Sequence, residues 1–73
     1  MLKLTQLPLN SRGKISFVNA VGPLRRRLLD LGFVPGTVVE MVRRSPAGSP
    51  AVYLIRGTMI ALRKEQSDNI WVE

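Results

Sequence analysis

Glycine and proline divide this chain of 73 residues into short segments, which limits it to short strands and short helices. Between these breaks lie runs rich in β-branched and aromatic residues, a composition that favours β-strands. Five such runs are predicted to be strands, at residues 14–21, 37–43, 51–56, 58–63 and 70–72. Gly57 separates two of them, which predicts a hairpin, and the last run is expected to pair with an earlier strand and close the sheet.

One short helix is predicted at residues 23–31. Pro23 suits its first position, where an N–H would have no partner within the helix, and Gly32 suits the left-handed residue that ends it. One helical face carries the apolar residues Leu24, Leu28 and Leu31, which are expected to face the core. The predicted fold class is therefore all-β with one short helix, a small five-stranded β-barrel of SH3-like or OB-like kind.

The composition indicates a single domain covering residues 1–73, with no internal repeat and no linker. The chain has no cysteine and no histidine, so neither disulfides nor the usual zinc or haem ligands can stabilise it. Hydrophobic residues make up 45% of the chain, which is typical of a globular protein. Packing alone is expected to hold the fold.

A cytoplasmic location is expected. The absence of cysteine is compatible with a reducing compartment, and residues 1–14 contain no apolar run of signal-peptide length. The longest stretches without charge, residues 15–24 and 45–55, are shorter than the roughly 18 residues that a spanning helix needs. The chain is not predicted to enter a membrane by itself.

The charge favours an anionic partner, because eleven Lys and Arg against five Asp and Glu give a net charge of +6. Catalysis is not predicted, since there is no histidine and the acids are scattered. Gly13 and Lys14 do not belong to a phosphate-binding loop, because Pro8 stands where its earlier glycine should be and Ile15 replaces its Ser or Thr. A metal at Glu65 and Asp68 is disfavoured. We therefore predict no enzyme, and no catalytic, cofactor-binding or metal-binding residue.

Four separate motifs resemble the FeoA family and together cover essentially the full chain. The first is RRLLDLGFVPGT at residues 26–37. SPAGSP at residues 45–50 resembles the family's proline–glycine loop, GTMIALR at residues 57–63 its hairpin, and Ile70 with Val72 its closing strand. Two positions depart from the pattern, because Ser49 stands where an acid is frequent and Ser67 where alanine is common.

The resemblance implies an SH3-like barrel that acts beside FeoB, a ferrous-iron membrane transporter with a cytoplasmic GTPase domain. It implies an accessory or regulatory protein of ferrous-iron uptake, which reaches the membrane only through the transporter. The same barrel forms the carboxy-terminal domain of DtxR-type iron-responsive repressors. No helix-turn-helix region is present here, which favours a separate accessory module.

Arg25, Arg26 and Leu29 are the predicted partner-binding residues. Leu29 lies about 140° around the helix from Leu24 and is expected to face outward, where it could anchor a partner while the arginines steer its approach. The alternatives are a solvated helix face with a weak Arg26–Asp30 pair, and a leucine covered by residues 33–35. A basic nucleic-acid-binding barrel is the alternative function, disfavoured because the four aromatic residues are far apart in sequence.

Overall fold

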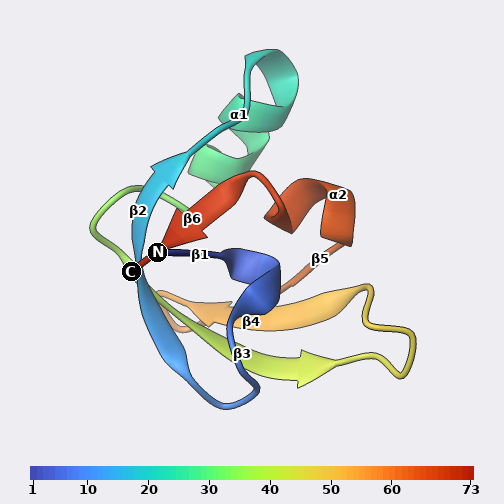
Figure 1. Cartoon of the computed structure of the whole chain (residues 1–73). Coiled ribbons are helices and arrows are strands. Elements are labelled where there is room, and N and C mark those ends of the chain that lie inside the picture. The colour runs from blue at the N-terminus through green and yellow to red at the C-terminus, as the bar shows by residue number, and fades with distance from the viewer.

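A single antiparallel sheet with the strand order β1-β6-β2-β3-β4-β5 forms the body of the protein. The computed structural model describes all residues, 1–73. The chain runs through β1 (Leu2–Lys3), the 3₁₀ helix η1 (Leu4–Gln6), β2 (Arg12–Val18), α1 (Gly22–Asp30), β3 (Val38–Arg44), β4 (Ala51–Ile55), β5 (Thr58–Leu62), α2 (Lys64–Ser67) and β6 (Ile70–Val72). Figure 1 shows the sheet curling around η1, with α1 projecting from one end.

All five predicted strands are present, and the helix begins one residue before its predicted start. Three elements were not predicted: the two-residue strand β1, which pairs with β6, the 3₁₀ helix η1 that follows it, and the helix α2 in the polar connection before β6. The terminal strand β6 pairs with β2 as well as with β1, as expected of a closing strand. All three use residues without marked periodicity, and they depend on contacts with distant parts of the chain.

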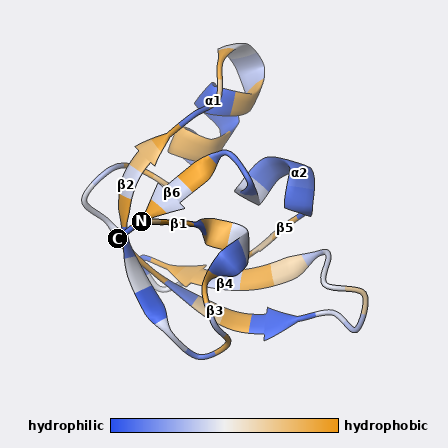
Figure 2. Ribbon diagram, viewed as in Figure 1, coloured by the Kyte–Doolittle hydropathy of each residue, from blue (hydrophilic) through white to orange (hydrophobic).

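The core lies inside the curled sheet, and every strand from β2 to β6 contributes to it. Burial alternates along β4, where Ala51, Tyr53 and Ile55 face inward, because successive side chains of a strand point to opposite faces. Figure 2 shows hydrophobic residues along β2, β4 and β6 and hydrophilic residues on α2. The buried hydrophobic residues are Leu4, Leu7, Ile15, Val18, Leu28, Phe33, Val39, Met41, Ala51, Tyr53, Ile55, Leu62, Ile70 and Val72.

The turn between β4 and β5 consists of Arg56 and Gly57 alone. Both have positive φ, +50° and +77°, which defines a type I′ turn, whose twist matches that of the flanking strands. The closing pair is Ile55 with Thr58, and the register continues without a bulge to Ala51 with Leu62. The predicted hairpin is therefore confirmed.

Hydrogen bonds from Arg44 at the end of β3 and to Asp68 at the end of α2 fix the N-terminal segment. The Arg44 guanidinium donates to the carbonyl oxygens of Thr5 and Leu7, at 3.3 Å and 3.0 Å. The Thr5 hydroxyl donates to the Asp68 carboxylate at 2.7 Å, and the Lys64 ammonium donates to it at 2.8 Å. The bonds from Lys64 and Thr5 lower the pKa of Asp68.

The loop at residues 45–50 lies at the surface and contacts α2. The Ser49 hydroxyl accepts the backbone N–H of Lys64 at 3.0 Å, in the first turn of α2. A serine oxygen and a carboxylate oxygen can both accept such an N–H. Serine at this position therefore supplies the kind of bond that an acid could make.

Replacing Tyr53 by phenylalanine is expected to change the response of the protein to alkali. Burial raises the pKa of Tyr53 above its ordinary value of 10.0, and its buried hydroxyl has no hydrogen-bond partner. The Ser67 hydroxyl donates to the Arg63 carbonyl instead, at 3.3 Å. In the unfolded chain the phenol ionises near pH 10, whereas in the folded protein it keeps its proton to higher pH. The free energy of unfolding therefore falls as the pH rises above about 10.

The Tyr53→Phe variant should lose less stability than the parent between pH 9 and pH 11, roughly the range over which a free phenol ionises. At pH 7 its free energy of unfolding should equal that of the parent or exceed it by about 1 kcal/mol, because an unpaired buried hydroxyl is removed. Urea unfolding across this pH range measures both effects. If the free energy of unfolding of the variant fell with pH as steeply as that of the parent, the prediction would be contradicted.

Candidate functional site

Helix α1 is fixed to the barrel at its C-terminal end. The backbone N–H of Gly32 donates to the Leu29 carbonyl and that of Phe33 to the Leu28 carbonyl, each at 3.0 Å. Together with the positive φ of Gly32, +108°, these bonds form a Schellman cap, in which a left-handed glycine satisfies the last carbonyls of a helix. The predicted cap at Gly32 is confirmed, and Leu28 and Phe33 beside it are fully buried.

The leucine stripe of α1 is buried unequally. Leu28 is fully buried, whereas Leu24 and Leu31 are partly buried and pack against the edge of the core. Figure 1 shows the C-terminal end of the helix nearest the barrel and its N-terminal end projecting away. The predicted stripe therefore faces the core, with Leu28 as its anchor.

Leu29 is not the outward-facing residue that the helical wheel predicted. It is partly buried and packs against the core cluster. It follows Leu28 directly, about 100° around the helix, in the turn that lies nearest the barrel. In this last turn of the helix the barrel covers the face of Leu28 and also the neighbouring face of Leu29. Leu29 therefore presents only part of its side chain to solvent.

Arg25, Arg26 and Arg27 are all exposed, but their environments differ. The Arg25 guanidinium donates to the Val18 carbonyl at 3.2 Å, which ties the helix to the end of β2. Arg26 makes no ion pair, and the weak pair that the sequence suggested with Asp30 is not formed, because the ion pairs of the protein are Arg12–Glu40 and Lys64–Asp68. Most of the positive charge of α1 is therefore available to a partner.

Two open hollows flank α1. The first has a volume of about 390 Å³, and Arg25, Arg26 and Leu29 line it together with Gly22 and Asp30. The second, of about 340 Å³, is lined by Pro23, Arg26, Arg27, Asp30 and Leu31. The structure thus brings the three predicted residues to one hollow, where two guanidinium groups and one carboxylate surround part of a leucine side chain.

An aromatic cluster on the outer face of the sheet was missed by sequence reasoning. Phe17 of β2 stacks on Trp71 of β6, with ring centroids 5.9 Å apart and planes 15° apart. The Lys3 ammonium lies 5.8 Å from the centroid of the Trp71 ring. These residues meet because β6 lies between β1 and β2. Pairing the terminal run with residues 14–21 would have revealed the contact.

A curled antiparallel sheet with one projecting basic helix defines a small SH3-like barrel domain. The FeoA domain model matches residues 2–73, and the chain belongs to the FeoA family, which is linked to ferrous-iron transport. None of its helices has the length and apolar character needed to cross a membrane. Its acidic side chains form no group of three or more that could hold a metal ion.

Proteins of known structure resemble this chain over nearly its whole length. It is 38% identical to iron(II) transport protein A of Clostridium thermocellum, with a TM-score of 0.95 over 99% of this chain and 44% of that one. It is 31% identical to FeoA of Stenotrophomonas maltophilia, an SH3 domain protein complexed with zinc, with a TM-score of 0.89 over 100% of this chain and 91% of that one. A manganese-dependent transcriptional repressor at 15% identity and IdeR of T. acidophilum at 19% identity share the fold alone.

A curated relative joins this domain to a transporter. The chain is 32% identical over 72 residues to the Fe(2+) transport protein A/Fe(2+) transporter FeoB fusion protein of Porphyromonas gingivalis. The match covers 99% of this chain but 8% of the fusion protein. In that protein, an FeoA domain and an FeoB transporter are parts of one polypeptide.

Proposed function

We propose that this chain is a cytoplasmic accessory protein of ferrous-iron uptake and acts by binding the cytoplasmic GTPase region of an FeoB-type transporter. The binding surface is the α1 surface, which consists of Arg25, Arg26 and Leu29. The observation that carries the proposal is that these three residues line one hollow of about 390 Å³. The fusion of FeoA and FeoB in a relative supports the choice of partner.

The α1 surface has the chemistry of a contact with an acidic protein. Its exposed arginines are part of the net charge of +6, and such charge accelerates the approach of an acidic partner. The exposed part of Leu29 lies between them and can be covered by an apolar side chain of the partner. Buried apolar anchors surrounded by polar groups typically carry much of the energy of an interface.

Binding to nucleic acid remains the weaker alternative. The structure brings two aromatic residues together, Phe17 and Trp71, which sequence reasoning had treated as separate. Trp71, however, lies between Lys3 and Phe17 in the strand order, so neighbours occupy both sides of its ring. Base stacking needs a free aromatic face, and Phe17, which is 42% exposed, offers only one.

Variants of the α1 surface test the proposal in a binding assay with the purified GTPase region. Arg26→Ala should slow association by up to about tenfold at low salt and flatten the salt dependence, since Arg26 has no structural partner. Leu29→Ala should speed dissociation by about fivefold or more, which corresponds to about 1 kcal/mol. Arg25→Ala should slow association too, but it also removes the bond to Val18.

Arg27→Ala is the matched control. It removes one arginine from the same helix, and this arginine lines only the second hollow. Thermal unfolding checks that each variant is folded. If a folded variant lacking all three side chains bound the GTPase region like the parent, the α1 surface would be excluded, and the loop at residues 45–50 would be the next candidate.

A further inference from the structure

Strand β5 forms one edge of the sheet, and the backbone groups of two of its five residues have no partner. It pairs with β4 alone. In a two-residue hairpin the pair next to the turn exchanges both hydrogen bonds, so Thr58, Ile60 and Leu62 turn their backbone groups toward β4. The N–H and C=O groups of Met59 and Ala61 therefore point away from the sheet, and no other hydrogen bond of the protein involves them.

This edge lacks the features that usually prevent a further strand from adding. Natural sheets protect their edges with charges, prolines, bulges or very short strands. The sequence of β5 is TMIAL, without charge or proline, and its register with β4 is regular over five residues. The opposite edge is β1, which is only two residues long. The two edges of the sheet are thus unequal, and only β5 presents a continuous row of backbone groups.

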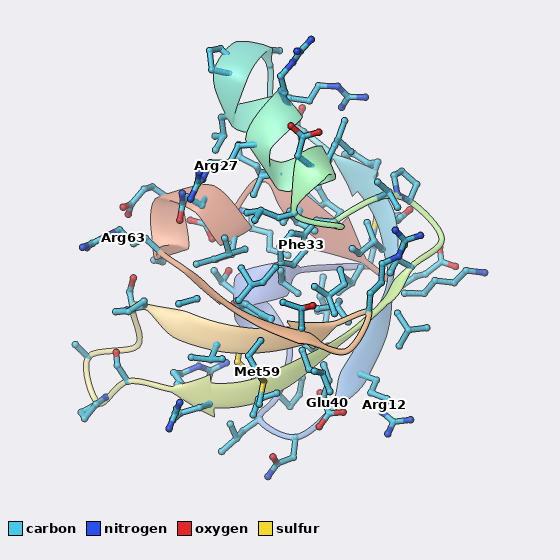
Figure 3. The ribbon with its side chains drawn as sticks, turned by 180° about the vertical axis from the view of Figure 1, so that it is seen from behind. Arg12, Arg27, Phe33, Glu40, Met59 and Arg63 are labelled. Atoms are coloured by element: carbon cyan, nitrogen blue, oxygen red, sulfur yellow. The ribbon has the colours of Figure 1, made fainter.

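We propose that the β5 edge binds an extended peptide segment of a partner protein as an additional strand. Addition of a strand gives affinity through backbone hydrogen bonds and specificity through alternate side chains. The proposal concerns a surface separate from the α1 surface and does not depend on the proposed function. Figure 3 shows Met59 on the far side of the strands from Phe33, so this side chain lies on the outer face of the sheet.

The outer face beside this edge is apolar and would cover alternate side chains of the added strand. Met59 is 58% exposed and Ala61 is also exposed. Their neighbours on β4, Leu54 and Val52, are partly buried on the same face. The bound segment is therefore expected to place apolar or β-branched residues toward Met59 and Ala61.

Charge at the two ends of β5 decides between a foreign segment and a second copy of this chain. Arg56 precedes the strand and Arg63 follows it, both are exposed, and neither forms an ion pair. In an antiparallel pair of two β5 strands, with Met59 opposite Ala61, Arg56 would lie opposite Lys64. Like charges directly opposite are destabilising, and each copy carries a net charge of +6.

An acidic partner segment removes this conflict. Arg56 lies in the turn before the five residues of β5, and Arg63 follows them, so one arginine stands at each end of the strand. The segment that fits this edge has an uncharged, β-branched centre and an acidic residue at each end. The chemistry thus identifies an acidic, extended peptide and disfavours self-association through β5.

A fluorescent eight-residue peptide of alternating valine and threonine, with glutamate at both ends, tests this inference on the chain of 73 residues. The anisotropy of the peptide reports binding, and amide exchange measured by NMR reports where it binds. Saturating peptide should slow exchange of the Met59 and Ala61 amides by tenfold or more, with little change at Ile60, which already faces β4. The same peptide with lysine at both ends should bind at least about tenfold more weakly, a change of about 1.4 kcal/mol.

Ala61→Pro is the blocking variant, because its lost N–H points away from β4 and the ladder of the hairpin stays intact. It should weaken peptide binding at least about tenfold, a change of about 1.4 kcal/mol. Ala61→Val is the matched control, which keeps the N–H and the outer face and should bind like the parent. A peptide with N-methylated backbone amides tests the same bonds on the unaltered protein and should not bind.

Several results would overturn the inference: no binding at millimolar peptide, equal binding of the lysine-ended or the N-methylated peptide, or full binding by Ala61→Pro. Protection of amides elsewhere, with Met59 and Ala61 unchanged, would also refute it. Sedimentation that shows a dimer abolished by Ala61→Pro would identify a second copy as the occupant and reject the acidic segment.

Discussion

Replacing Leu28 by alanine is expected to lower the free energy of unfolding by about 2–5 kcal/mol, a large part of the total stability of a domain of this size. Leu28 is fully buried in the core, and its carbonyl accepts the N–H of Phe33 in the cap of α1. Truncation leaves a cavity at the place where the helix meets the barrel. Urea unfolding followed by Trp71 fluorescence measures the loss.

Leu24→Ala is the matched control for this prediction. It makes the same truncation on the same stripe of α1, but Leu24 is only partly buried at the edge of the core. Surrounding side chains and water can fill the space that is left, so the loss should be distinctly smaller than that of Leu28→Ala. Equal losses in the two variants would mean that α1 is not anchored through Leu28.

The elements that could be predicted from the sequence are those that local chemistry determines. Gly32 and the Arg56–Gly57 turn require backbone conformations that few residues adopt, so the helix end and the hairpin lie where they were predicted. Strand β1 has only two residues, Leu2 and Lys3, and it is a strand only because β6 is beside it. No local pattern can reveal an element whose order comes from a partner far away in the sequence.

The candidate site shows the same division. The exposure of Arg25 and Arg26 follows from the helical pattern, and the structure agrees. The partial burial of Leu29 does not follow, because a helical wheel gives the direction of a side chain but not the depth of the helix in the barrel. The Phe17–Trp71 stack required the sheet topology, which the sequence left open. The bond from Arg25 to Val18 is local, but it depends on the angle between β2 and α1.

Replacing Gly32 by alanine is expected to lower the free energy of unfolding by about 2–3 kcal/mol, the upper part of the range for a strained backbone conformation. The φ of Gly32, +108°, lies well beyond the +50° to +70° or so that a residue with a side chain occupies in the left-handed region. This strain is located at the cap of α1, where the N–H groups of Gly32 and Phe33 donate to helix carbonyls. The amide of Phe33 should therefore also lose protection from exchange.

Gly57→Ala separates the cost of a positive φ from the role of Gly32 in the cap. The φ of Gly57 is +77°, close to the left-handed region, and an added Cβ there would meet nothing within 4 Å. Alanine at this exposed turn should therefore cost only about 1 kcal/mol and leave the protection of Phe33 unchanged. If Gly32→Ala lost more stability than Gly57→Ala but left the protection of Phe33 unchanged, backbone strain alone would account for the role of Gly32. If Gly32→Ala loses more and Phe33 loses its protection, the cap positions α1, and the α1 surface depends on a glycine that no partner needs to touch.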